Sequence, residues 1–170
     1  MDPIDCIAAR YSCRDFYAQP VPRELLEKLV DAGRRAPSGR KEEPVEFIVV
    51  TGHADRDFLA QIATAGKFIA QAGACIVVIA RAATYYLEDG SAAAQNVLLA
   101  ATALGLQSCW VAGDKKSYAG EILRHFGAPA GYKLVAMLAI GHAITPGRQP
   151  PHRPLAEVLH WEKFGTASAP

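Results

Sequence analysis

The sequence lacks any marked excess of charge of one sign. Its 18 lysines and arginines nearly balance its 17 aspartates and glutamates, which leaves a formal net charge of +1 over 170 residues. Proteins that bind nucleic acids need an accumulation of Lys and Arg to attract the phosphate groups. The balanced charge therefore argues against a nucleic-acid partner.

Long hydrophobic runs are missing as well. Although 51% of the residues are hydrophobic, no segment approaches the ~20 consecutive apolar residues that span a bilayer. The first ten residues, MDPIDCIAAR, contain neither the basic region nor the long apolar region of a secretory signal. We therefore expect a cytoplasmic protein in reducing surroundings, without a membrane partner.

Several familiar cofactor and metal motifs are absent. The sequence has no G-x-G-x-x-G, no G-x-x-x-x-G-K-[ST] and no G-x-S-x-G, which argues against a Rossmann site, a P-loop and a nucleophile elbow. The histidines form no H-x-x-x-H or H-E-x-x-H pair, so we expect no metal. The cysteines show no C-x-x-C spacing and are expected to be reduced; they are Cys6, Cys13, Cys75 and Cys109.

Helical patterns alternate with short apolar runs along the chain. Strands are predicted at 45–52, 74–82, 108–113 and 133–143. Helices are predicted at 3–10, 22–36, 54–73 with a break near Gly66, 89–107 with Gly105 as the C-terminal cap, and 117–127. This alternation predicts a single domain of the α/β or α+β class.

The end of the chain differs from this pattern. Residues 144–154, ITPGRQPPHRP, are too rich in proline for regular structure and predict an extended arm. A segment with helical spacing, LAEVLHWEKF, follows at 155–164. An irregular arm needs a surface to lie on, so we expect it to pack on a partner subunit.

Three clusters could carry chemistry. Arg10, Ser12 and Arg14 alternate, so an extended segment would send their side chains to one side. They form either a solvated turn or an anion site. The anion site is chemically reasonable because guanidinium groups bind phosphate in bidentate fashion. Residues 34–44, RRAPSGRKEEP, form either a plain polar connection or a ligand loop. Residues 104–113, LGLQSCWVAG, form either an ordinary core strand or a strand whose small last residues let a flat ligand approach the backbone.

The order of these clusters resembles the nitroreductase family of flavoproteins, which bind FMN at a homodimer interface. The family pattern R-R-S-x-R-x-F is similar to ARYSCRDF, and PVPxELLExLLEAARxAPS is similar to PVPRELLEKLVDAGRRAPS. Two further patterns resemble EDGSAAAQNVLLAATALGLQSCWVAG and AIGHAITPGRQPPHRPLAEVLHWE. The resemblance covers nearly the whole chain in the same order. It implies an α+β fold of three layers (helices on both faces of a mixed, largely antiparallel sheet), with a core of residues 1–143 and an arm of residues 144–170.

The resemblance also implies a set of residues that bind the cofactor. They are Arg10, Tyr11, Ser12, Arg14, Pro37, Ser38, Gly39, Lys41, Lys67, Val111, Ala112, Gly113 and Arg153. In this interpretation Arg10 and Ser12 hold the FMN phosphate with Arg153 from the other subunit, and Arg14 lies at the N1/O2 edge of the flavin.

Two other groups complete the implied site. Residues 37–39 lie against the isoalloxazine ring from the partner chain, and backbone N–H groups near residues 112 and 113 face O4 and N5. Lys67 supplies a second cation near the pyrimidine edge.

One loop departs from the family pattern. Where the family has P-S-x-x-N-x-Q-P-W, this chain has Lys41 in place of Asn, Glu43 in place of Gln and Val45 in place of Trp. Lys41 then either reaches the pyrimidine oxygens of the flavin or pairs with Glu42 and Glu43 in a structural role.

The implied function is that of an FMN-dependent oxidoreductase with NADH or NADPH as the reductant. It would reduce nitroaromatics, quinones or similar electron-poor acceptors by ping-pong hydride transfer, and no acid or base side chain is required because the cofactor carries the chemistry. The alternatives are a flavin- or nucleotide-binding protein with little or no turnover, a specialised flavin enzyme of the dehalogenase-like or flavin-consuming kind, and a non-flavin α/β protein.

Overall fold

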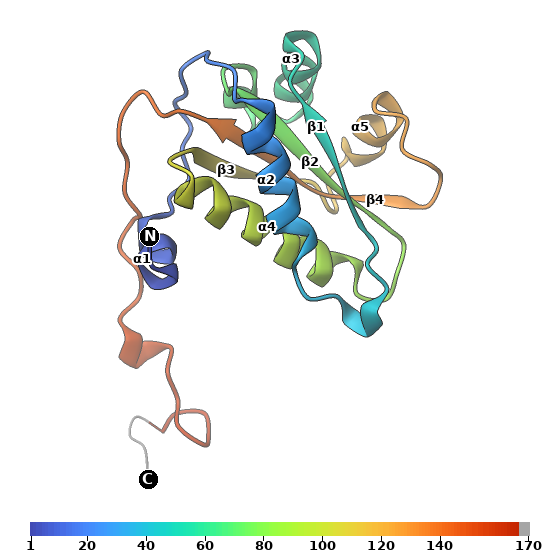
Figure 1. Cartoon of the computed structure of the whole chain (residues 1–170). Coiled ribbons are helices and arrows are strands. Elements are labelled where there is room, and N and C mark those ends of the chain that lie inside the picture. Colours follow the sequence, from blue (N-terminus) through green and yellow to red (C-terminus); the bar gives the residue numbers. More distant parts are fainter. Residues whose placement is uncertain (167–170) are drawn as a thin grey trace.

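A four-stranded sheet forms the centre of the computed structural model, which describes residues 1–166 (Figure 1). Its strands are β1 (Val45–Val50), β2 (Ala74–Arg81), β3 (Gln107–Ala112) and β4 (Tyr132–Gly141). The strand order is β1-β2-β4-β3, and all three neighbouring pairs are antiparallel. The two central strands are almost entirely buried, as their continuous apolar sequences predict. β1 and β3 are therefore the two edges of the sheet.

Five α-helices surround this sheet. They are α1 (Pro3–Ala9), α2 (Arg23–Arg34), α3 (His53–Ile62), α4 (Tyr86–Ala103) and α5 (Ala119–His125). Three short 3₁₀ turns lie between or after them, namely η1 (Gly39–Lys41), η2 (Lys67–Ala70) and η3 (Leu155–Glu157).

The sheet separates two hydrophobic clusters, because successive side chains of a strand point to opposite faces. On one face Leu29 of α2 and Val97 of α4 pack with Ile76 of β2. On the other face Leu59 of α3 and Ile122 of α5 pack with the opposite side chains of β2 and β4. The predicted α+β class with helices on both faces is confirmed.

Most predicted elements are confirmed, and the helical segment predicted at 155–164 is the one that differs. The break near Gly66 separates α3 from η2, and Gly105, with φ +77°, follows the C-terminal end of α4 as predicted. The four strands are wholly antiparallel, and the only parallel pairing described is an isolated bridge between Ser12 and Ser108 beside β3.

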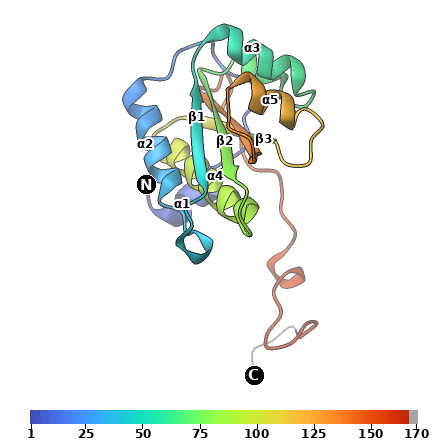
Figure 2. The ribbon, with the colours of Figure 1, turned by 90° about the vertical axis from the view of Figure 1, so that its right-hand side faces the viewer.

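The arm leaves the body of the protein (Figure 2). Its first part is attached, because the Gln149 side chain donates to the carbonyl oxygens of Ile7 and Arg10 at 2.7 and 2.6 Å. Beyond it, the predicted helical segment 155–164 contains only the three-residue turn η3. Within residues 1–166 nothing buries its apolar side, since Leu155 is 71% and Phe164 93% exposed. The last part of the predicted arm, residues 167–170, lies outside the described residues.

No helix within residues 1–166 is long and apolar enough to cross a membrane.

Gly73, just before β2, provides a test of how closely residues 19–21 pack on the start of that strand. A Cβ atom there would overlap the carbonyl oxygen of Gln19 and lie 2.9 Å from Cγ2 of Val21. We expect Gly73→Ala to lower the free energy of unfolding by about 1–3 kcal/mol, because the backbone of residues 19–21 would have to move. Urea unfolding measures this change.

Gly120→Ala is the matched control. The nearest atom to a Cβ at Gly120 is 3.6 Å away, and alanine is favoured over glycine in a helix by up to ~1 kcal/mol. Stability should be unchanged or raised. Equal effects of the two substitutions would contradict the described contact between residues 19–21 and the start of β2.

Candidate functional site

The segment from Arg10 to Arg14 lies along the open edge of β3. Ser12 forms a parallel bridge with Ser108, and the backbone N–H of Cys13 donates to the carbonyl oxygen of Ser108 at 3.0 Å. Cys13 is only 3% exposed, whereas Ser12 and Arg14 are exposed and Arg10 is half-buried. The alternation predicted from the sequence therefore holds, and the hydroxyl and the guanidinium groups lie on the side opposite the Cys13 thiol.

The environment of Cys109 shows that these groups gather around β3. Burial raises the pKa of the Cys109 thiol, and the guanidinium of Arg14, the hydroxyl of Ser12 and, more weakly, the guanidinium of Arg10 oppose this rise. Burial also raises the pKa of Cys75 to about 12. Thiols that stay protonated at neutral pH are poor nucleophiles. The four cysteines are all buried and free, so none of them presents its thiol to a substrate.

The C-terminal end of β3 is closely packed. Val111 is buried, Ala112 is exposed, and a Cβ at Gly113 would lie 2.6 Å from Cγ of Leu134. The Gly113 N–H donates to the Val135 carbonyl oxygen at 3.2 Å. This amide, which we expected to face a ligand, therefore already has a partner within the chain.

Asp114 lies directly after this strand and was not identified from the sequence. Its Oδ1 accepts a hydrogen bond of 2.8 Å from the Tyr86 hydroxyl, which raises the pKa of Tyr86. Its Oδ2 is buried without a partner among the described residues. A buried acceptor without a donor is costly, so this oxygen marks a position where a ligand or water could donate.

Lys67 lies near the same end of β3. It is the exposed first residue of η2, and a Cβ on the preceding Gly66 would lie 3.2 Å from Cγ1 of Val111. A cavity of about 570 Å³ opens there between residues 62–65 and the segment 112–121. Ala112 and Lys116 are among the residues that line it.

The loop of residues 37–43 is held by a buried carboxylate. Asp89, in the first turn of α4, is 6% exposed. Its Oδ2 accepts from the Ser38 hydroxyl at 2.8 Å and its Oδ1 from the Gly39 N–H at 2.9 Å. The Ser38 hydroxyl in turn accepts from the Glu43 N–H at 2.9 Å. No sequence pattern indicates this role, because an acidic residue at a helix N-terminus is common.

Lys41 is exposed at the tip of this loop. Within residues 1–166 no ion pair joins it to Glu42 or Glu43. The structural alternative, in which these glutamates neutralise Lys41, therefore has no support from the contacts. Val45 begins β1 and is half-buried.

One chain does not bring the predicted residues together into one site. The Arg10–Arg14 segment lies beside β3, whereas the loop 37–43 leads into β1 at the opposite edge of the sheet (Figure 1). Arg153 is exposed on the arm and pairs with Glu157, with 3.3 Å between Nε and Oε2. Residues 10–14 and 111–114 lie along β3 with Lys67 near its C-terminal end, residues 37–41 lie at the other edge of the sheet, and Arg153 lies on the arm.

Tyr11 takes a different position from its neighbours. Its half-buried ring packs against Gly147 of the arm, and burial raises the pKa of its hydroxyl. It belongs to the hydrophobic cluster that contains Cys13. Tyr11 therefore joins the first part of the arm to the core.

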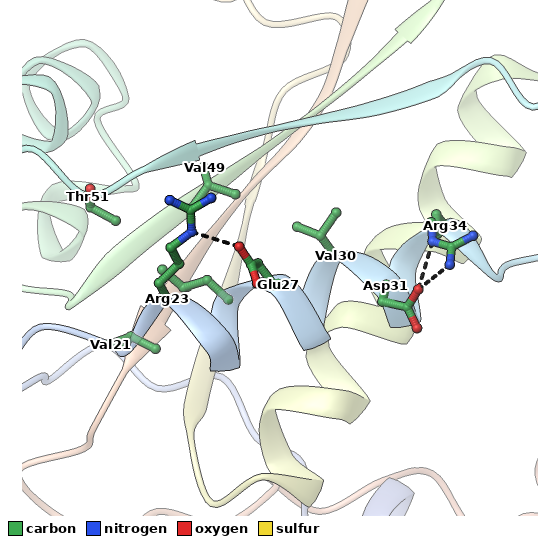
Figure 3. Close-up of a pocket in the computed structure, with 9 residues that line it drawn as sticks. Val21, Arg23, Glu27, Val30, Asp31, Arg34, Val49 and Thr51 are labelled. Carbon is green, nitrogen blue, oxygen red and sulfur yellow. Dashed lines mark hydrogen bonds and ion pairs between the residues drawn. The ribbon is translucent and has the colours of Figure 1, made fainter.

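A cavity of about 840 Å³ lies elsewhere, between α2 and the edge of β1 (Figure 3). Arg23 and Glu27 form an ion pair of 2.7 Å in its wall, and Arg34 pairs with Asp31. None of the predicted site residues lines it. Its arginines are neutralised by neighbouring carboxylates, so it lacks the unpaired cations of the Arg10–Arg14 segment.

Comparisons with known proteins agree with the predicted family. The model of the "Nitroreductase family" matches residues 7–74 and 63–142. A candidate NADH dehydrogenase/NAD(P)H nitroreductase of Methanothermobacter thermautotrophicus is 33% identical over 115 residues, which cover 65% of this chain and 60% of the relative. A protein of the same description from Archaeoglobus fulgidus is 32% identical over 146 residues, which cover 80% of this chain and 82% of the relative.

Solved structures are similar over almost the whole chain. A candidate NADH dehydrogenase/NAD(P)H nitroreductase from Bacteroides thetaiotaomicron superposes with a TM-score of 0.89 at 30% identity, covering 95% of this chain and 98% of that one. An FMN-dependent nitroreductase from Clostridium difficile superposes with a TM-score of 0.88 at 28% identity, covering 95% of this chain and 99% of that one.

The role of Asp89 can be tested directly. We expect Asp89→Ala to leave the Ser38 hydroxyl and the Gly39 N–H without their acceptor. The free energy of unfolding should fall by about 1–3 kcal/mol, and the Gly39 amide should exchange its hydrogen faster. Hydrogen exchange followed by mass spectrometry over residues 36–44 measures the local effect.

Glu88→Ala is the control, because Glu88 is an exposed acidic residue in the same helical turn. It removes the same charge from the same end of α4 and should leave exchange in the loop unchanged. If Asp89→Ala also left this exchange unchanged, the loop would not depend on the carboxylate.

Proposed function

The chain belongs to the nitroreductase family, and from this premise we propose that it is an FMN-dependent NAD(P)H oxidoreductase. In more detail, we propose that it reduces nitroaromatics, quinones or similar electron-poor acceptors in a ping-pong cycle. The proposal draws on the relatives named above, of which one is described as an FMN-dependent nitroreductase and two as candidate NAD(P)H nitroreductases. The observation that carries it is that Arg10 and Arg14, which have no carboxylate partner within residues 1–166, lie on either side of the exposed Ser12 at the edge of β3.

The residues at this edge fit the phosphate end of FMN. Within residues 1–166 neither Arg10 nor Arg14 takes part in an ion pair, and the Ser12 residue between them is exposed. Two guanidinium groups without carboxylate partners, on either side of an exposed hydroxyl, match the donors that a phosphate requires. Arg10 and Ser12 would hold the phosphate.

The other end of the segment fits the flavin ring. Arg14 would lie at the N1/O2 edge, where a cation stabilises negative charge, and Lys67 would lie near the pyrimidine edge. The backbone of residues 111–113 would line the ring at the exposed Ala112, since the Gly113 N–H already donates to the Val135 carbonyl oxygen. When bound, FMN supplies the hydride chemistry, and the residues of the chain bind and orient it.

We propose further that the complete site needs a second copy of the chain. The loop 37–41 lies at the opposite sheet edge from the Arg10–Arg14 segment of the same chain. Arg153 lies on the projecting arm, where its side chain contacts Glu157 and not a residue of that segment. The arm also exposes Leu155, Trp161 and Phe164, which are 71%, 41% and 93% exposed, and exposed apolar groups of this kind favour a partner surface. In a homodimer, residues 1–143 would form the core and residues 144–170 the arm that packs on the partner.

A flavin-binding protein with little or no turnover is the second candidate. It is favoured by the departures at Lys41, Glu43 and Val45, because these residues replace the Asn, Gln and Trp of the family pattern. Lys41 can still donate to the pyrimidine oxygens, but as a charged group in place of an amide.

The spectrum of the protein loaded with FMN distinguishes the two candidates. We expect a yellow protein that is bleached anaerobically by NADH or NADPH, and that regains its colour when a nitroaromatic or a quinone is added. Colour without bleaching would favour the binding protein. Failure to take up added FMN would overturn the flavin proposal as a whole.

The phosphate assignment can be tested at two residues. We expect Arg10→Ala and Arg153→Ala each to weaken FMN binding by about 1.5–3 kcal/mol, because each removes a charged hydrogen bond to phosphate. This corresponds to a dissociation constant raised ~10- to ~100-fold, which the quenching of FMN fluorescence measures.

Arg124→Ala is the matched control for these variants, since it removes an exposed arginine on α5. FMN binding should not change in this variant. Light scattering should show a dimer for the parent protein and for all three variants, so that a weaker site is not confused with a lost interface. A monomer at micromolar concentration would contradict the site shared by two chains.

A further inference from the structure

The loop 37–43 contains a concentration of unusual backbone angles. Arg40 and Lys41 both have φ of 57°, and Glu43 has φ of 44°. This left-handed region is unfavourable for residues other than glycine. Three such residues within four positions are retained only where the surrounding structure holds them, and clusters of this kind occur at ligand-binding sites.

The surrounding contacts do hold this loop. Asp89 fixes Ser38 and Gly39 at its start. Arg81 fixes its end, because Nη2 donates to the carbonyl oxygen of Glu42 at 2.9 Å. Gly39 lies so close to the ring of Tyr85 that a Cβ would be 2.6 Å from Cδ2. The tip, residues 40 and 41, is therefore positioned before any ligand binds.

Arg40, at this tip, carries a positive charge that no carboxylate neutralises within residues 1–166. Its Cζ atom lies 5.8 Å from the centre of the Tyr85 ring, and the ring is itself 41% exposed. Arg40 is exposed and takes part in no ion pair among the described residues, even though Glu42 and Glu43 are close in sequence. A guanidinium held on an aromatic ring, with its donors open, is preorganised to bind a carboxylate.

We propose that Arg40 is a specificity-determining residue, and that the site it faces prefers electron-poor acceptors carrying a carboxylate over neutral acceptors of the same shape. This rests on the proposed function, which places residues 37–39 and Lys41 of one chain against the cofactor held by the other. Arg40 lies between these residues and is not among those proposed to hold the cofactor. Its charge is therefore available to the second substrate.

The test compares two pairs of molecules of nearly equal shape. Calorimetry with the FMN-loaded protein measures the binding of benzoate and benzamide, and steady-state kinetics measures kcat/KM for 4-nitrobenzoate and 4-nitrobenzamide. We expect the parent protein to favour the charged member of each pair. The preference should decrease as salt is added, because exposed charges are screened.

Substitutions then identify the residue responsible. Arg40→Asn removes the charge but tolerates the left-handed backbone, and it should lower the preference about tenfold while leaving benzamide binding unchanged. Arg40→Lys should keep part of the preference. Tyr85→Leu should lower it by about threefold, since it removes only the supporting ring. Arg124→Ala should have no effect.

Two results would overturn the inference. One is equal binding of benzoate and benzamide to the parent protein, and the other is a preference that survives Arg40→Asn. In either case, bleaching of the flavin by NAD(P)H would show that the proposed function still stands. A protein that takes up no FMN would overturn the proposed function, and this inference with it.

Discussion

The close packing of α4 on the sheet is the constraint on which the rest of the structure depends. A Cβ at Gly90 would lie 2.6 Å from Cγ2 of Val135, so the helix rests almost directly on β4. Its apolar side, which includes Ala94 and Val97, is buried in the same cluster as α2. Because a small residue allows this short distance, the N-terminal part of α4 is fixed close to β4, and its C-terminal end is tied to the sheet by the short connection into β3. Each end then positions one half of the candidate site.

The N-terminal turn of α4 carries Tyr85, Tyr86 and Asp89. Asp89 and Tyr85 fix the loop 37–43, and Tyr86 reaches Asp114 after β3. The C-terminal end leads through Gly105 directly into β3, whose free edge receives the Arg10–Arg14 segment. One rigid helix thus sets the positions of two groups that lie on opposite edges of the sheet, which is the arrangement expected of a site completed by a second chain.

The sequence predicts the strands and most helices of this architecture well, because their side chains follow a regular pattern. Apolar runs identify the four strands, and alternation places Ser12 and Arg14 opposite Cys13, as burial confirms. The strand order and the partners of Asp89 could not be predicted. The Gly39 amide lies 50 positions away in the sequence, and no local pattern encodes a hydrogen bond that tertiary packing creates. The left-handed angles of Arg40 and Lys41 are equally hidden, because local preference would place Gly or Asn there. The helical spacing of residues 155–164 predicted a helix, but only the turn η3 forms there. The reason is related, since an amphipathic pattern forms a stable helix only where a surface buries its apolar side.

The arginines of the chain differ in whether a carboxylate pairs with them. Arg34 and Arg35 share Asp31, whose pKa they lower through hydrogen bonds; such pairs belong to the surface of α2 and leave no charge for a ligand. Arg10, Arg14 and Arg40 have no carboxylate partner in the described chain. The ion pair of Arg153 with Glu157 is exposed on both sides, as are the pairs of α2. An exposed pair of this kind contributes only ~0–1 kcal/mol, less than a charged hydrogen bond to phosphate, so a phosphate on the partner subunit could take the place of Glu157.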